Sequence, residues 1–364
     1  MIKFYSSPNP TIGVEIELQL IDNKTLNLKN ISPKVLANID KKFFDRIKYE
    51  LFESMIEINT DICRSVEEVG DDIKQTLLHL EDILKNYNAS INFSSIHPFA
   101  KGKNQIVSDN SRYKRIMKDL QIIGRRFITQ GLHVHIGIDD CEKVIKVNNS
   151  MRTYLPLLLA LTTSSPFYEE EDTGLYSYRT KIFESLPLAG LPDYLTDWDH
   201  FIQLTNNLTK AGVIKSVKDL WWEVRPHPGF GTVEIRVCDI PINFKEILAL
   251  VALIQALVIT LQNSDEYHNT HIQILESNKW QAVRYGLEGT FIDPITLKQL
   301  TIRKAIENLC NLIEPMMISL GSGKYIKIIE NILIKGTGAT KQREYYNNLG
   351  SFEHMIKSLK EQFY

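Results

Sequence analysis

Hydrophobic and polar residues alternate in one stretch near the start of the chain, from Gly13 to Leu20. Successive side chains of a β-strand point to opposite faces, so this alternation predicts a strand with one aliphatic face and one polar face. The polar face carries Glu15, Glu17 and Gln19. Taken alone, two such carboxylates are explained equally well by a solvent-exposed strand face.

The same alternation recurs in residues 53–59, 132–138 and 232–237. The polar positions of these stretches are Glu53, Glu57 and Asn59, then His133 and His135, then Glu234 and Arg236. Four strands of this kind predict an α+β fold built on one antiparallel β-sheet. We expect helices to cover the apolar face of the sheet and the polar face to line a cavity that is the candidate active site.

Carboxylates crowded in one cavity would be protonated, or would destabilise the fold, unless a cation neutralised them. Oxygen-rich sites that include a histidine suit hard divalent ions such as Mg²⁺ and Mn²⁺. The imidazole could come from the pair His133 and His135, and a structural ion pair explains Glu53 at least as well. The carboxylates expected at the metal site are those of Glu15, Glu17, Glu57 and Glu234.

The rest of the chain predicts mostly helices. Ser65 followed by Glu68 is a capping-box pattern that starts a long helix, whose apolar residues repeat at helical spacing. Residues 46–59 predict a strand with a break near residues 52–54, and residues 144–163 predict a helix that Pro156 either kinks or starts. From Asn243 the pattern is helical to the end, apart from breaks near residues 286–294 and 321–323. No linker-like stretch divides the chain, so we expect one domain over residues 1–364.

Composition argues against several functional classes. The net charge is −2 without a long run of one sign, which does not indicate a nucleic-acid-binding surface. The first residues lack the apolar core of a signal peptide, and the apolar run from Ile247 to Leu261 is shorter than the roughly 20 residues of a membrane span. Four cysteines without paired spacing favour reduced thiols. We therefore expect a cytoplasmic protein with no membrane or nucleic-acid partner, and the oligomeric state stays open, with a homodimer as one alternative.

Four segments carry a resemblance to a known family, and they follow one another between Gly13 and Pro241. They read GVEIELQLID, ESMIEINTDIC, QGLHVHIGI and RPHPGFGTVEIRVCDIP. In this set and order the chain resembles the glutamate–cysteine ligase type 2 family of carboxylate–amine ligases, whose catalytic fold is related to that of glutamine synthetase. Residues 172–179 and 336–343 also look like that family, so the resemblance covers nearly the whole chain. Residues 164–171 are more acidic than the family's usual asparagine- and glycine-containing segment, which bears on substrate preference.

The resemblance implies roles for the acidic set and for several basic residues. Five residues match positions at which the family binds the divalent ions that chelate ATP, and they are the predicted metal ligands: Glu15, Glu17, Glu57, His133 and Glu234. His135 could instead orient a neighbouring group. Arg236 resembles a phosphate-contacting arginine, and Arg225 and Arg179 resemble positions that hold a substrate carboxylate or phosphate. Lys341 and Arg343 could close over the nucleotide from the C-terminal tail. The alternatives are a salt bridge for Arg236 and ordinary surface charge for the other four.

The resemblance thus implies an ATP-dependent ligase that uses Mg²⁺ or Mn²⁺. Such an enzyme transfers the γ-phosphoryl group of ATP to a carboxylate, here a glutamate-like one, and an amine then attacks the acyl phosphate to form a γ-glutamyl amide. The family implies cysteine as the reference acceptor, but another amino acid or amine is not excluded by the sequence. Two other classes stay open, namely a non-catalytic relative that binds nucleotide or amino acid, and a metal-dependent hydrolase. The segment Gly321–Tyr325 is not a P-loop, because it lacks the first glycine at the required spacing and the Ser or Thr after the lysine.

Overall fold

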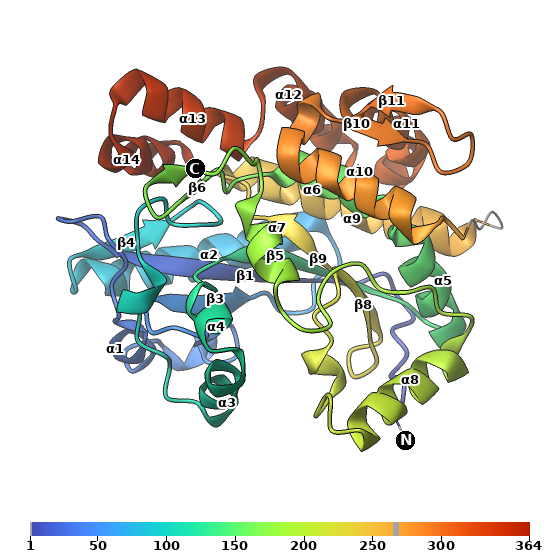
Figure 1. The fold of residues 1–364 in the computed structure, drawn as a ribbon, viewed down its shortest axis with the longest axis horizontal. Coiled ribbons are helices and arrows are strands. Elements are labelled where there is room, and N and C mark those ends of the chain that lie inside the picture. The colour runs from blue at the N-terminus through green and yellow to red at the C-terminus, as the bar shows by residue number, and fades with distance from the viewer. Residues whose placement is uncertain (1, 265–268) are drawn as a thin grey trace.

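One antiparallel sheet forms the centre of the protein in the computed structural model, which describes residues 2–264 and 269–364 (Figure 1). Its strands are β1 (Ile12–Asp22), β2 (Ile47–Tyr49), β3 (Met55–Asn59), β4 (Ala89–Asn92), β5 (Gly131–Gly137), β8 (Val224–His227) and β9 (Thr232–Asp239). Their order is β2-β3-β1-β5-β9-β8, and β4 pairs with the end of β1. The four alternating stretches of the sequence correspond to β1, β3, β5 and β9. The predicted antiparallel sheet and the α+β class are therefore confirmed.

The pairing of β1 brings acidic and histidine residues together on one face of the sheet. Glu17 lies opposite Glu57 of β3, and Glu15 lies opposite His133 of β5. Directly opposite residues of neighbouring strands have their side chains on the same face. The register of the sheet, set by its apolar face, thus determines which polar groups meet.

A β-bulge shapes the other half of this face. The pairing of β5 with β9 shifts between Leu132 and Val134, so that β9 has one extra residue there. Bulges bend a strand, re-aim its side chains and are frequent beside active sites. Arg236 lies within the bulged part of β9, two residues after Glu234.

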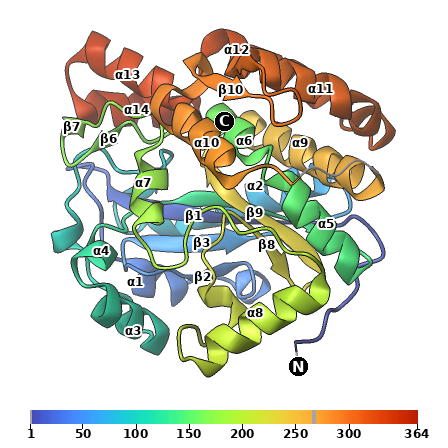
Figure 2. The same cartoon turned by 45° about the vertical axis from the view of Figure 1, so that its right-hand side comes forward.

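Helices cover the apolar face of the sheet. The helices in contact with it are α2 (Val66–Lys85), α5 (Cys141–Met151), α6 (Leu155–Thr162) and α9 (Phe244–Asn263), as Figure 2 shows. At the start of α2, the Glu68 N–H donates to the Ser65 hydroxyl, and the Arg64 N–H donates to the Glu68 carboxylate. The predicted helix start with Ser65 as N-cap is therefore confirmed, although Glu68 accepts from the N–H of Arg64 and not from that of Ser65, as a complete capping box would require.

Helix α9 contains the long apolar run of the sequence. By length and composition this described helix could cross a membrane, but 72% of its apolar window is buried inside the protein. It packs against α2, α5, α11 (Ile302–Ser319) and α12 (Ile326–Lys335). The prediction of a buried core helix is therefore confirmed.

The C-terminal third is helical, as predicted, and lies on the same side of the sheet as α9 (Figure 1). It continues with α10 (Ile272–Tyr285), α11, α12, α13 (Gly338–Leu349) and α14 (Phe352–Gln362). A small hairpin of β10 (Thr290–Ile292) and β11 (Gln299–Thr301) interrupts it and was not predicted. Residues 265–268, inside the stretch predicted as helical, lie outside the described residues.

The remaining elements connect these strands and helices. They are α1 (Ser32–Leu36), α3 (Ser111–Leu120), α4 (Ile122–Arg125), α7 (Tyr178–Glu184) and α8 (Trp198–Lys210), with the two-residue strands β6 (Phe167–Tyr168) and β7 (Glu171–Asp172). Single-turn 3₁₀ helices lie at Lys41–Phe43, Gly102–Asn104, Val217–Asp219, Gly286–Glu288 and Gly323–Tyr325. Helices α3 and α8 lie on the other side of the sheet from α9, near its two ends (Figures 1 and 2).

Two predicted breaks are present in the structure. Residues 46–59 form two antiparallel strands, β2 and β3, so the predicted break is confirmed, but Glu53 lies in the turn between them rather than in a strand. Residues 144–163 belong to two helices, and Pro156 lies in the first turn of α6, so of the two predicted alternatives Pro156 marks the start of a helix. The single domain over residues 1–364 stays a prediction.

Candidate active site

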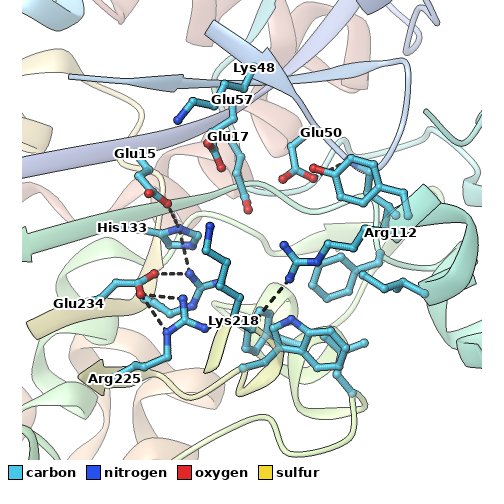
Figure 3. Close-up of a pocket in the computed structure, with 18 of the residues that line it drawn as sticks. Glu15, Glu17, Lys48, Glu50, Glu57, Arg112, His133, Lys218, Arg225 and Glu234 are labelled. Atoms are coloured by element: carbon cyan, nitrogen blue, oxygen red, sulfur yellow. Dashed lines mark hydrogen bonds and ion pairs between the residues drawn. The ribbon is translucent and has the colours of Figure 1, made fainter. Parts of the chain in front are cut away.

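A cavity of about 310 Å³ opens on the polar face of the sheet (Figure 3). The structure brings every predicted metal ligand and two of the three predicted substrate arginines into its wall. These lining residues are Glu15, Glu17, Glu57, His133, Glu234, Arg225 and Arg236.

One group of potential metal ligands consists of Glu15, His133 and Glu234, whose ligand atoms all lie within 4.8 Å of one another. Nδ1 of His133 lies 3.3 Å from Oε2 of Glu15, and Nε2 of His135 lies 3.5 Å from its Oε1. Burial would raise the pKa of Glu15, but its hydrogen bonds with the two histidines hold that pKa well below its ordinary value. The buried Nε2 of His133 has no hydrogen-bond partner among the described residues. A carboxylate pair with an unpartnered imidazole nitrogen fits a divalent cation.

A second group consists of Glu17, Glu50 and Glu57, whose carboxylates face a common space in Figure 3. Burial, and then the charges of Glu17 and Glu57, raise the pKa of Glu50 well above its ordinary value. Burial, and then the charge of Glu15, raise the pKa of Glu57 to about 7. Carboxylates in such a position either hold protons or share a cation. Oxygen ligands of this kind suit Mg²⁺.

Glu50 is a residue that the sequence analysis missed. It lies in the turn between β2 and β3, so it has no place in the alternating pattern that marked the other carboxylates. The signal available in the sequence was its position seven residues before Glu57, on the far side of a strand break.

Arg225 and Arg236 both bind Glu234. Nε and Nη2 of Arg225 donate to Oε2 of Glu234 at 2.9 and 2.7 Å, and Nη1 of Arg236 donates to Oε1. Burial would raise the pKa of Glu234, but the two guanidinium groups keep it well below its ordinary value. Salt bridges, the alternative explanation for Arg236, are thus present, and Arg236 lines the cavity as well. Its buried Nε has no hydrogen-bond partner among the described residues.

His135 has a supporting position beside this cluster. Its Nδ1 lies 2.9 Å from the hydroxyl of Thr232, and its Nε2 lies between Glu15 and Glu234 at 3.5 and 3.8 Å. The ring also contacts the exposed ring of Phe230 edge-on. This arrangement agrees with the expectation that His135 orients a neighbouring group.

Arg179 does not line the cavity. Its guanidinium is 3% exposed and packs against β9, where it donates to the carbonyl oxygens of Val237 and Arg236 and lies 3.9 Å from Asp239. A Cβ at Gly131 would lie 2.1 Å from Nη2 of Arg179, so the absence of a side chain there makes room for the guanidinium. The contact of Arg179 with nucleotide or substrate stays a prediction.

Lys341 and Arg343 also lie outside the cavity wall. Lys341 pairs with Glu246 at 3.0 Å, and Arg343 pairs with Asp172 at 2.6 Å. Their predicted closure over a nucleotide stays a prediction. Three other cations that were not singled out in the sequence do line the cavity, namely Lys48, Arg112 and Lys218.

Comparisons with known proteins identify the family of the chain. Residues 11–361 match glutamate-cysteine ligase family 2. A provisionally named glutamate–cysteine ligase 2 from Gloeobacter violaceus is 39% identical to the chain over 364 residues, which cover 98% of both proteins. A similarly named protein from Solibacter usitatus is 34% identical and covers 98% of this chain and 94% of its own length.

Solved structures show the same fold. A glutamate–cysteine ligase from Francisella tularensis, in complex with AMP, superposes with a TM-score of 0.75 at 16% identity, over 99% of this chain and 90% of its own. A bifunctional glutathione synthetase from Pasteurella multocida superposes with a TM-score of 0.72 at 14% identity, over 97% and 52%. The glutamine synthetase-like fold is thereby confirmed. The chain belongs to glutamate-cysteine ligase family 2, which confirms the prediction of an ATP-dependent ligase.

Proposed function

We propose that this protein joins the γ-carboxyl group of glutamate, or of a closely similar acid, to an amine through an acyl phosphate formed with ATP. The observation that carries the proposal is the presence of two clusters of carboxylate side chains and of two arginines, Arg225 and Arg236, around one cavity. The provisional name of the relatives, glutamate–cysteine ligase 2, and the AMP bound to the Francisella protein support glutamate and a nucleotide as ligands.

Two sets of side chains would hold divalent ions: Glu15, His133 and Glu234, and Glu17, Glu50 and Glu57. An Mg²⁺ or Mn²⁺ ion held by these residues would supply positive charge that neutralises the ATP phosphates. The donor sets fit such ions, because oxygen atoms predominate and one imidazole nitrogen lacks a partner.

Two arginines of the cavity wall, Arg236 and Arg225, stabilise negative charge on the transferred phosphoryl group. Arg236 keeps donors beyond its bond to Glu234, and its planar fork can reach two phosphoryl oxygens at once. Arg225 is held more firmly, because it makes two bonds to Glu234 and donates to the carbonyl of Leu220 at 2.8 Å. We assign it to orienting Glu234 and to the electrostatics of the cavity.

The metal-dependent hydrolase and the non-catalytic relative, which the sequence alone left open, do not agree with membership of a ligase family. A hydrolase would use the same cations without glutamate-dependent ADP release, and a non-catalytic relative would bind nucleotide without turnover. A cytoplasmic location and small-molecule substrates stay predictions. The oligomeric state also stays a prediction, with a homodimer as one alternative.

The test is ADP release with Mg²⁺, ATP, glutamate and hydroxylamine, a small amine that traps acyl phosphates as hydroxamates, which give coloured complexes with Fe³⁺. Glutamate-dependent hydroxamate and ADP in equal amounts are expected. Glu15→Gln should abolish both, whereas Glu53→Gln, at an acidic residue outside the cavity wall, should leave them unchanged. ADP release that is independent of glutamate, or no hydroxamate, would overturn the proposal.

A further inference from the structure

One end of the cavity is lined mostly by apolar side chains, with Arg112 as a charged residue beside them (Figure 3). Its wall combines helix α3, the segment before β5, helix α7 and the segment before β8. The side chains that form this apolar end are Tyr113, Ile116, Leu120, Phe127, Phe183 and Trp221.

This apolar end is built before any ligand arrives. The hydroxyl of Tyr113 donates to the carbonyl of Tyr49 at 3.1 Å, which fixes the ring against the β2–β3 turn. The rings of Phe127 and Phe183 contact each other with centroids 5.7 Å apart. Aromatic pairs at such distances add to the free energy gained from their burial. The pocket therefore has a defined shape instead of closing on itself.

A buried ion cluster holds two parts of the wall together. Nζ of Lys279 in α10 lies 2.7 Å from the Glu184 carboxylate at the end of α7, and it also pairs with Glu223 just before β8. Lys279 and Glu223 are 5% and 3% exposed. Because breaking a buried pair is strongly unfavourable, this cluster fixes α7, with Phe183, relative to the segment that carries Trp221.

The anionic substrates do not suit the apolar end. Glutamate and the phosphates of ATP carry charges that belong near Arg236 and the metal ligands. The charged group at the apolar end, the guanidinium of Arg112, already donates to the Lys218 carbonyl at 3.3 Å and pairs with Asp219 at 3.5 Å. Adenine also needs partners for its polar edge. A second cavity of about 540 Å³ shares Lys218, Arg225 and His227 with the first and provides such groups in Thr205 and Asn206. The amine is the reactant left for the apolar end.

We propose that the apolar end binds the side chain of the acceptor amine, and that the acceptor carries a bulky apolar group, preferably an aromatic one. The inference rests on the proposed function and names the substrate class of the same site. In the reaction, the lone pair of the amine nitrogen forms a bond to the acyl carbon. The bond from that carbon to the phosphate oxygen breaks, phosphate leaves with the bonding electrons, and the nitrogen loses one proton.

The experiment compares kcat/KM for phenethylamine and phenylalanine with the values for cysteine and 2-aminobutyrate, using glutamate as the donor. One methylene in an apolar pocket discriminates by about tenfold or more. We expect at least one aromatic acceptor to exceed both small ones by about tenfold or more. Equal values, or a preference for cysteine, would overturn the inference. Hydroxylamine turnover by the same wild-type protein tests the proposed function separately, because hydroxylamine has no side chain to place.

A filling variant locates the preference in this pocket. Ile116→Trp should lower the ratio of kcat/KM for the aromatic acceptor to that for 2-aminobutyrate by about tenfold or more. Lys118→Trp, at an exposed position of the same helix, should leave the ratio unchanged. Ile116→Ala is the second variant if the tryptophan impairs folding, and it should shift the preference toward larger side chains. An unchanged ratio in the folded variants, or a raised KM for ATP in place of a changed ratio, would overturn the assignment and point to adenine in this pocket.

Discussion

Arg225 and Glu234 form a buried bidentate ion pair in which both bonds go to one oxygen of the carboxylate, Oε2. The other oxygen, Oε1, is left for Arg236 and for the space near His135. The pair thus fixes the orientation of Glu234 and separates the roles of its two oxygens. The two arginines on this carboxylate should consequently respond differently to substitution.

Arg236→Lys should preserve the fold and slow phosphoryl transfer by about 10²-fold or more, since lysine offers one point charge in place of a planar fork. Rates of glutamate-dependent ADP release and thermal melts measure both effects. Arg225→Met should instead lower the free energy of unfolding by about 3 kcal/mol, because it leaves the Glu234 carboxylate buried with fewer partners. Near-normal turnover of Arg236→Lys would remove Arg236 from the mechanism.

Glu50→Gln should stabilise the metal-free protein and abolish most of its activity. The pKa of Glu50 is raised by burial and by Glu17 and Glu57, so above its ordinary pKa the unfolded chain releases a proton that the folded chain retains. Stability in EDTA should therefore fall with rising pH in the wild type, and less so in the variant. Melts in EDTA at pH 5 and pH 8 measure this difference. We expect Mg²⁺-dependent turnover to drop by at least about tenfold. An equally active variant would exclude Glu50 as a ligand.

The sequence predicted the strands of the site well because a two-residue repeat reports directly on which side chains share a face of a sheet. It could not place Glu50, which lies in a turn, where no repeat applies. Arg179 was selected by resemblance, yet its guanidinium packs beside Gly131 and Asp239, a contact between segments far apart in the chain. The apolar end of the cavity could not be predicted from the sequence either, because it also depends on contacts between segments far apart in the chain. Ile116 and Phe183 have the spacing of ordinary core residues, and only the tertiary arrangement turns them toward a pocket.

Catalysis should not depend on a cysteine. No thiol of the chain lines the cavity, and burial raises the pKa of Cys63 and Cys238 to about 12 and that of Cys310 to about 11. Burial, and then Asp140, also raise the pKa of Cys141, so a thiolate nucleophile is disfavoured at neutral pH. Cys141→Ser and Cys310→Ser should each keep the hydroxamate rate of the wild type. Loss of that rate in either folded variant would indicate an acyl thioester in place of an acyl phosphate.

His97 should make the fold sensitive to mild acid. The side chain is fully buried. Its Nε2 bonds to the carbonyl of Leu26 at 2.7 Å, and its Nδ1 accepts from the Ala100 N–H at 3.1 Å. These contacts require the neutral ring with its proton on Nε2, because Nδ1 must remain an acceptor. Burial lowers the pKa of His97 to about 4.

Because this folded-state pKa is below the value of about 6.5 in the unfolded chain, the unfolded state binds the proton first as the pH falls. The stability that depends on neutral His97 is complete above pH 6.5 and declines below it, by about 2 kcal/mol between pH 6.5 and pH 5. Urea unfolding at pH 7.5, 6.0 and 5.0 measures this decline. His97→Gln should be less stable at pH 7.5 and should show a flatter dependence on pH, whereas His354→Gln, at an exposed histidine, should follow the wild type. Parallel curves for the wild type and His97→Gln would assign the acid sensitivity to other groups.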